Sequence, residues 1–427
     1  MDAYLGELLK VHYALQQATK VWRRCEKLSP EVEELKKKAI LLNHKRYYEN
    51  IPLYHDWVNS NHCDINADID TIINDLVLTG EIFKNYDKQW IQNNDFVSLT
   101  EWLSRIYIKR ISSDTMHSVE NLSAWRDSLR KLGVNINYSS GSQGRLSIIP
   151  RDAMTLRALS INPQYYADLS WNIDENGKKK PFFCLIAGFR GDAMGIQSSA
   201  QGLARGALKT HYMFSEVLDA DMIRGKKKAT ISIESEILQS ISFIQNAIKE
   251  NIAILIFGTP FLVARLCRAI QNMHLSLRLP ENSLVVTGGG WKTFLGEKLP
   301  KKDFLTLLYD TLNITSANYT DAYSSVEINC TLSSCSENKY HIPPLLEPVV
   351  YDSSLYGEIG REGFGVIGLF DPFAMSYPGF LITGDQGHLV HGVCKCGLDG
   401  WSITGEIMRA TKEEIKGCGG VSHYLVS

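Results

Sequence analysis

Hydrophobic residues alternate with polar ones on both sides of a short polar stretch, residues 139–144. A repeat of two positions is typical of half-buried β-strands, whose side chains point to opposite faces in turn. The alternating residues are Val134, Ile136, Tyr138, Leu146 and Ile148. The pattern therefore predicts a β-hairpin with residues 139–144 at its tip.

Before this hairpin, up to about residue 132, the hydrophobic spacing is mainly helical. Ser29 and Pro30 predict the start of a charged helix that runs towards Tyr48, because proline is well tolerated in a first helical turn. No residue pattern in this region indicates chemistry. We interpret it as a helical part of the body.

After the hairpin, predicted strands and helices alternate. The pattern predicts strands at 182–187, 252–257 and 284–286, a helix over 200–214, and a strand edge leading into a helix over 231–249. Strand, glycine turn and helix then recur, which is typical of a mostly parallel sheet that binds ligands at its strand ends. We therefore expect an α/β fold in which helices flank mostly parallel sheets.

Proline, glycine and β-branched residues recur with tight turns from about residue 343, which predicts a small β-rich subdomain. The expected divisions are a helical N-terminal region at 1–132, an α/β body at 133–342, the β-rich subdomain at 343–392 and a short C-terminal segment at 393–427.

The composition is that of an ordinary soluble globular chain, with 427 residues, 44% hydrophobic and 22% charged. A net charge of -2 offers no bulk attraction for nucleic acid or anionic lipid, so any anion site must be local, and we expect no nucleic-acid partner. The start lacks a signal-peptide pattern, and the longest apolar run, 252–264, is too short to span a membrane. We expect a cytoplasmic protein whose nine cysteines, an odd number, are reduced thiols.

The hairpin tip combines hydroxyl groups with bare backbone, and both can hold anionic oxygens. The candidate phosphate-binding residues are Ser139, Ser140, Gly141, Ser142 and Gly144. The stretch is not a P-loop, since Arg145 opens a strand where that motif has Gly-Lys-Ser/Thr opening a helix. A flexible surface turn is the alternative if the loop is taken alone.

Three further stretches offer what nucleotide-driven carboxylate activation needs. Backbone at Gly288, Gly289 and Gly290 can lie flat on adenine. The Glu327 carboxylate can hold Mg²⁺, and Asp385 can accept hydrogen bonds from both ribose hydroxyls. With the hairpin, these stretches resemble in order and spacing the adenylate-forming (acyl-adenylating) superfamily over residues 139–427.

The resemblance narrows to one family. Residues 287–292 (Thr-Gly-Gly-Gly-Trp-Lys) and 416–418 (Lys-Gly-Cys) are similar to the acyl-protein synthetases of bacterial luciferase fatty-acid reductase. A more distant similarity to the phenylacetate–CoA ligases covers residues 47–54 and 327–341. This resemblance implies the large N-terminal domain of an adenylate-forming enzyme, without the large C-terminal domain that carries a catalytic lysine.

The resemblance implies a two-step reaction that depends on ATP and Mg²⁺. A carboxylic acid, such as a fatty acid, would form an acyl-adenylate, and the acyl group would pass to the thiol of Cys418 and then to a partner protein. The partner would be an acyl reductase or a carrier protein. Alternatives are transfer to coenzyme A, an amine or a carrier protein, or a non-catalytic partner that binds nucleotide or acyl groups.

The same resemblance assigns Tyr323 to the nucleotide site and suggests Lys292 as a catalytic cation, although a lysine after a glycine turn is as readily solvent-exposed. Relatives usually carry an arginine in a Gly-Arg motif after the aspartate. Here Leu398 follows Gly397 and Glu406 follows Gly405, so that arginine is missing from both places.

A competing constellation consists of thiols and one imidazole that are suited to zinc. These residues are Cys330, Cys335, His341, Cys394 and Cys396. Four residues separate the first two cysteines and one separates the last two, so the spacing is irregular, and we expect no metal there.

No Gly-x-Ser-x-Gly elbow or Gly-x-Gly-x-x-Gly turn supports a serine hydrolase or a dinucleotide enzyme.

Overall fold

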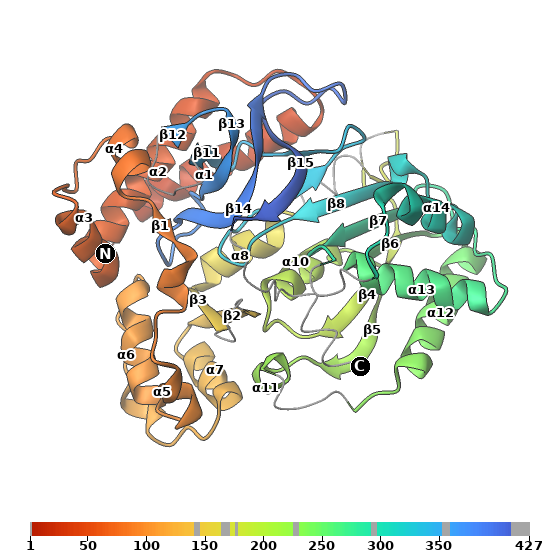
Figure 1. Ribbon diagram of the computed structural model, residues 1–427, viewed down its shortest axis with the longest axis horizontal. Coiled ribbons are helices and arrows are strands. Elements are labelled where there is room, and N and C mark those ends of the chain that lie inside the picture. Colours follow the sequence, from red (N-terminus) through yellow and green to blue (C-terminus); the bar gives the residue numbers. More distant parts are fainter. Residues whose placement is uncertain are drawn as a thin grey trace.

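The computed structural model describes residues 2–140, 146–163, 171–175, 178–224, 230–291, 297–351 and 359–410. In this part of the chain, one 13-stranded sheet runs through the molecule in the order β12-β11-β13-β14-β15-β10-β9-β8-β7-β6-β4-β5, with β1 paired to β14. A separate two-stranded sheet, β2-β3, lies beside it (Figure 1).

The N-terminal region is helical, as predicted, and Figure 1 shows its helices gathered at one end of the molecule. They are α1 (Leu5–Arg23), α2 (Glu31–Asn50), α3 (Pro52–Ser60), α4 (Ile69–Asp75), α5 (Lys88–Gln92), α6 (Phe96–Ile106) and α7 (Leu122–Lys131). The helix α2 begins directly after Pro30, which confirms the predicted start. Between α4 and α5 lie the short strand β1 (Leu78–Thr79) and the 3₁₀ turn η1 (Gly80–Phe83).

One half of the large sheet is parallel. Its strands are β4 (Phe182–Arg190), β5 (Lys209–Val217), β6 (Ala253–Gly258), β7 (Leu284–Gly288) and β8 (Tyr319–Tyr323), in the order β5-β4-β6-β7-β8. The connecting and flanking helices are α8 (Ala153–Ile161), α10 (Gly195–Leu203), α11 (Ala220–Ile223), α12 (Ile233–Glu250), α13 (Pro260–Asn272) and α14 (Lys301–Leu312). The α/β alternation and the three predicted strands are confirmed.

The other half of the sheet is antiparallel apart from the short strand β1, which pairs with β14 in parallel. Its remaining strands are β9 (Leu332–Ser334), β10 (Lys339–His341), β11 (Glu347–Tyr351), β12 (Ile359–Gly360), β13 (Gly363–Phe370), β14 (Phe380–His391) and β15 (Trp401–Arg409). The two halves join where β8 pairs in parallel with β7 and antiparallel with β9. The change of direction therefore falls beside the glycine turn that follows β7.

Two sequence-based predictions were wrong. The helix predicted over 200–214 is two elements: α10 ends at Leu203, and the edge strand β5 begins at Lys209. Gly206 lies between them with φ +83°, in the left-handed region that favours glycine and ends a helix. No strand edge leads into α12, since among residues 230–250 regular structure begins with that helix at Ile233.

The predicted hairpin is formed by β2 (Asn135–Ser140) and β3 (Leu146–Arg151), which pair antiparallel with Ser139 opposite Ser147. Its tip, residues 141–145, lies outside the described residues. The Tyr138 N–H donates to the Ala193 carbonyl at 2.6 Å and so attaches the hairpin to the loop before α10.

A buried arginine joins the hairpin to the large sheet. The Arg151 side chain is fully buried and donates to Asn137 Oδ1 (2.9 Å), Asn329 Oδ1 (2.9 Å) and Tyr377 Oη (3.1 Å). The backbone N–H and side-chain amide of Asn329 both donate to Asp371 Oδ2, at 2.6 and 2.9 Å. Burial raises the pKa of Asp371 to about 6, although these hydrogen bonds act in the opposite direction. The network thus connects three distant segments through one guanidinium.

Replacing Arg151 by methionine should lower the free energy of unfolding by about 3 to 5 kcal/mol, because it leaves several buried acceptors unpaired. Urea denaturation followed by circular dichroism measures the change. As a control, Arg268→Met removes an arginine whose ion pair with Glu297 is solvent-exposed, and should change stability by about 0.5 kcal/mol or less. Equal effects of the two variants would contradict the assignment.

Candidate active site

The parallel half of the sheet ends in a glycine turn at the centre of the candidate site. Gly288 ends β7 and lies opposite Ala322 of β8. Gly289 and Gly290 follow with φ of +83° and +64°, a backbone conformation that other residues adopt only with strain. A Cβ added to Gly289 would lie 3.7 Å from Ile196 and Thr259, in ordinary contact. The conformation of the turn, more than lack of space, therefore requires glycine.

A partly buried polar cluster lies at the end of β7, next to this turn. The Thr287 hydroxyl donates to Asp321 Oδ1 at 2.5 Å, and the Tyr340 hydroxyl donates to Asp321 Oδ2 at 2.6 Å. The hydroxyls of Thr287 and Tyr319 lie 2.8 Å apart. Burial raises the pKa of Asp321, while the two donors counteract that shift. These bonds connect β7, β8 and β10 and so fix the strand ends that carry the glycine turn.

Tyr323 and Asp385, which the sequence analysis assigned to one site, are in contact. The Tyr323 hydroxyl donates to Asp385 Oδ2 at 2.7 Å. Burial, with the nearby Asp385 charge, raises the pKa of Tyr323 well above its ordinary value, so the phenol remains a neutral donor. The structure thus brings the C-terminal end of β8 and the middle of β14 together.

The other oxygen of Asp385 faces an arginine that the sequence analysis missed. Arg409 Nη1 lies 3.2 Å from Asp385 Oδ1 and 3.4 Å from the Thr383 carbonyl. Asp385 of β14 and Arg409 of β15 are cross-strand partners. In the sequence, Arg409 is marked only by its place in a strand-like stretch. Its pairing with Asp385 depends on the register between β14 and β15, which the sequence does not show.

Glu327 follows β8 and lies against η1. The Ser325 hydroxyl donates to its carboxylate, and a Cβ added to Gly80 would lie 3.6 Å from Oε1. Its carbonyl accepts from the Tyr377 hydroxyl at 2.8 Å, and the preceding Val326 carbonyl accepts from Arg151 at 2.5 Å. The backbone of this stretch is therefore held by Tyr377 and Arg151, and its carboxylate lies next to the Ser325 hydroxyl and to Gly80.

The phosphate-loop residues are only partly within the described structure. Ser139 lies on β2, half-buried, and Ser140 ends that strand. The predicted site residues outside the described part of the chain are Gly141, Ser142, Gly144, Lys292 and Cys418. The hairpin base carrying Ser139 is fixed by Arg151 to the stretch that carries Glu327.

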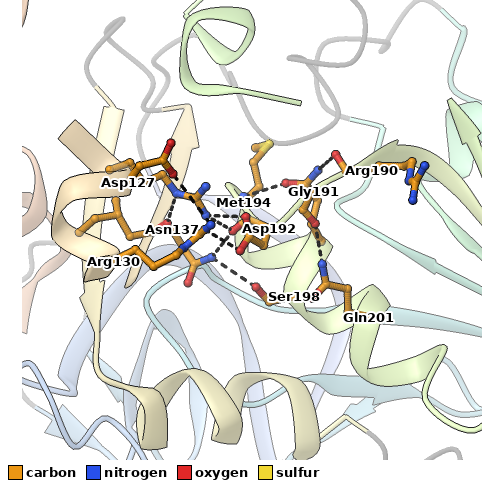
Figure 2. A network of polar contacts seen from close by, with 12 residues as sticks. Asp127, Arg130, Asn137, Arg190, Gly191, Asp192, Met194, Ser198 and Gln201 are labelled. Carbon is orange, nitrogen blue, oxygen red and sulfur yellow. Dashed lines mark hydrogen bonds and ion pairs between the residues drawn. The ribbon is translucent and has the colours of Figure 1, made fainter. Parts of the chain in front are cut away.

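A second polar network holds the other side of the hairpin (Figure 2). Arg126 and Arg130 of α7 each donate to one carboxylate oxygen of Asp192, both at 2.7 Å. Arg126 also donates to the Ile136 carbonyl of β2 at 3.0 Å, and Asn137 Nδ2 donates to the Asp192 carbonyl at 3.0 Å. Burial alone would raise the pKa of Asp192, but the two guanidinium groups outweigh it and lower the pKa. The ionised carboxylate thus links α7 and the loop before α10 to the hairpin.

A mainly apolar cavity of about 480 Å³ opens beside the glycine turn. This volume is within the range of roughly 300–1,000 Å³ of small-molecule sites. Gly288 and Gly289 line it, as do Ser324 and Ser325 next to Tyr323. Its apolar lining includes Leu159, Trp171, Ile196, Leu203, Phe257, Leu284, Val286 and Ala322. The cavity can take an apolar chain whose polar end faces the candidate nucleotide site.

Sequence comparison shows which known proteins this chain resembles. Residues 220–425 match the family described as acyl-protein synthetase, LuxE. The long-chain-fatty-acid–luciferin-component ligase of Aliivibrio fischeri is 28% identical over 135 residues, 31% of this chain and 36% of the relative. The ligase of the same name from Vibrio harveyi is 28% identical over 144 residues, 33% of this chain and 38% of the relative. This chain is similar to the acyl-protein synthetases. The matches span little more than a third of each curated relative.

Solved structures give the fold. An open conformation of 2-hydroxyisobutyryl-CoA ligase in complex with 2-HIB-AMP and CoA superimposes with a TM-score of 0.53 and 12% identity, covering 88% of this chain and 70% of that one. The thioesterification state of that ligase gives a TM-score of 0.54 and 12% identity, covering 91% and 70%. The predicted α/β fold is therefore confirmed, in the arrangement found in that ligase. Among the described helices, none is both long enough and apolar enough to cross a membrane.

The two arginines on Asp192 should contribute unequally to stability. Arg126→Gln should cost about 1 to 3 kcal/mol, because Arg126 is largely buried and also binds the Ile136 carbonyl. Arg130→Gln should cost about 1 kcal/mol or less, because that side chain is 43% exposed. The matched pair is compared by urea denaturation, and a larger loss for Arg130→Gln would contradict this account of the hairpin.

Proposed function

We propose that this protein uses ATP to activate a fatty acid as an acyl-adenylate, with release of pyrophosphate, and then transfers the acyl group to Cys418. The observation that carries this proposal is the Tyr323–Asp385–Arg409 contact beside a glycine turn that lines an apolar cavity. A nucleotide at this contact would have its α-phosphate near the polar end of an acid in the cavity.

Among the described residues, Tyr323 and Arg409 each contact a different oxygen of Asp385, and a carboxylate oxygen can accept a second hydrogen bond, here from a ribose hydroxyl. The backbone of Gly288, Gly289 and Gly290 would cover the adenine. Arg409 stands beside the aspartate although the Gly-Arg motif is absent from the sequence. We assign to it the contact that the missing arginine makes in relatives.

At the other end of the nucleotide, the hairpin tip would hold the triphosphate, with Ser139 and Ser140 from β2 and Ser142 from the loop. Glu327, with the Ser325 hydroxyl beside it and no side chain on Gly80, offers the oxygen ligands that Mg²⁺ prefers. Mg²⁺ bound there would offset the negative charge of the phosphates. Loop N–H groups, and Lys292 if it faces the site, would stabilise charge that grows on the α-phosphate during attack.

A fatty acid is the favoured substrate because the cavity lining is apolar and because the curated relatives are named as long-chain fatty-acid ligases. Cys418 would take the acyl group from the adenylate as a thioester, with AMP as the leaving group. A partner protein, such as an acyl reductase or a carrier protein, would receive it next. The experiments below distinguish this reaction from two alternatives: transfer of the acyl group to coenzyme A or an amine, and nucleotide binding without catalysis.

ATP–pyrophosphate exchange tests the first step. Exchange should depend on a carboxylic acid, with straight-chain fatty acids preferred over acetate. Arg409→Gln should raise KM for ATP about 10-fold or more, since a hydrogen bond to a charged group is worth roughly 1.5 to 3 kcal/mol. Lys298→Gln is the control, because it removes an exposed ion pair to Glu406, which lies on β15 as Arg409 does. Nucleotide binding without exchange for any acid, in folded protein, would contradict adenylation.

Loading with radiolabelled fatty acid tests the second step. Cys418→Ala should abolish covalent loading and leave ATP–pyrophosphate exchange within about two-fold of the wild type, because the thiol acts only after the adenylate forms. Cys63→Ser is the control and should load normally. If label persists on Cys418→Ala, or appears only on added coenzyme A, Cys418 is not the acceptor.

A further inference from the structure

Three cysteines and one histidine from two distant segments meet at the edge of the cavity. Cys335 directly follows β9 and His341 ends β10, so both belong to one hairpin. Cys394 and Cys396 lie in the loop between β14 and β15. Because β10 pairs with β15, with His341 opposite Ser402, the sheet carries the hairpin and this loop to the same place.

The donor atoms have the separations of a tetrahedral metal site. All four lie within 4.8 Å of one another, with 3.9 Å between the sulfurs of Cys335 and Cys394 and 3.3 Å between Cys396 Sγ and His341 Nε2. Zinc bonds of about 2.3 Å to sulfur and 2.0 Å to nitrogen place tetrahedral ligands roughly 3.8 Å (S–S) and 3.5 Å (S–N) apart. A disulfide would need about 2.05 Å. We propose that Cys335, His341, Cys394 and Cys396 bind one zinc ion.

The loop backbone is already shaped for this role. The Cys394 N–H donates to the Leu398 carbonyl at 2.8 Å, and the Gly397 N–H donates to the Cys394 carbonyl at 2.9 Å. Gly397 has φ +95°, which favours glycine. The two backbone bonds and this glycine hold residues 394–398 in a tight turn, which carries Cys394 and Cys396 on one loop.

The surroundings complement the charge of the site. Three thiolates and one Zn²⁺ leave a net charge of -1, and the positive side chains of Arg23 and Lys339 act electrostatically on His341. The Trp22 indole of α1 donates to the Asp399 carbonyl at 2.6 Å, and its ring lies 6.4 Å from the His341 ring. The loop between β14 and β15 is therefore packed against α1.

The expectation of no metal, based on irregular spacing, does not match this geometry. Strand pairing, not sequence spacing, brings the four ligands together, and Cys330 is not part of the group. Four protein ligands complete a tetrahedral shell, so the zinc would be structural, with no position open for substrate. Since Cys335 and Cys396 also line the cavity, the ion would fix one part of its wall. The site does not depend on the proposed activity.

Metal analysis of the purified full-length protein should find one zinc per chain. Cys394→Ser and His341→Ala should lose it, whereas Cys25→Ser should retain it, because Cys25 contacts the Cys396 carbonyl without joining the four donors. Zinc loss from Cys25→Ser equal to that from Cys394→Ser would overturn the ligand assignment. One iron per chain in place of zinc would overturn the metal assignment.

A second measurement covers variants that fail to fold. Wild-type protein stripped with a chelator should bind one Co²⁺ per chain, with the visible absorption of tetrahedral thiolate coordination, and zinc should displace it. Zinc should also raise the unfolding temperature of the stripped protein. Protein purified without stoichiometric metal that also gives no Co²⁺–thiolate absorption would overturn the proposal, whatever its adenylation activity.

Discussion

The geometry of the candidate site depends on one buried charge. The Arg151 guanidinium has no direct carboxylate partner among the hydrogen bonds described; it is satisfied by two amide oxygens, a phenol and the Val326 carbonyl. A buried charge is costly unless every donor is paired. Its acceptors come from the hairpin, from the stretch after β8 and from the turn before β14. Those three segments must therefore keep their relative positions. Because Ser139 lies in the first, Glu327 in the second and Asp385 in the strand that follows the third, Arg151 also fixes the relative positions of these residues.

The two halves of the large sheet supply different parts of the candidate site. The parallel half ends in the glycine turn and supplies most of the apolar cavity, as expected for ligands that bind at the carboxyl ends of parallel strands. The antiparallel half supplies Asp385 and Arg409. The strand β8 belongs to both halves, since it pairs with β7 in parallel and with β9 antiparallel. Tyr323, at its end, makes the contact that joins the two sets of residues.

Sequence reasoning succeeded where one local signal dominates. The continuous apolar runs that form β4, β6 and β7 and the alternation around residues 139–144 identified strands. The motif resemblance assigned Tyr323 and Asp385 to one site, and the structure brings the two side chains into contact. Sequence reasoning failed at 200–214, where a short helix, a glycine turn and an edge strand combine into one helix-like stretch. The pairing of Arg409 with Asp385 was not predicted, because it depends on which residue of β15 lies opposite which residue of β14. The sequence did single out the Cys/His set, but its irregular spacing could not show that the pairing of β10 with β15 brings four of the five residues together.

The register of β15 connects the proposed metal to the proposed nucleotide site. One edge of β15 pairs with β10 at His341, and the other pairs with β14, where Arg409 lies opposite Asp385. The register of this pair shifts between Gln386 and His388 of β14, where the extra residues lie in β15, between Thr404 and Met408. A slip of one residue would turn Arg409 to the opposite face. Zinc held by the loop that leads into β15 would fix the start of this strand, and with it the face on which Arg409 meets Asp385.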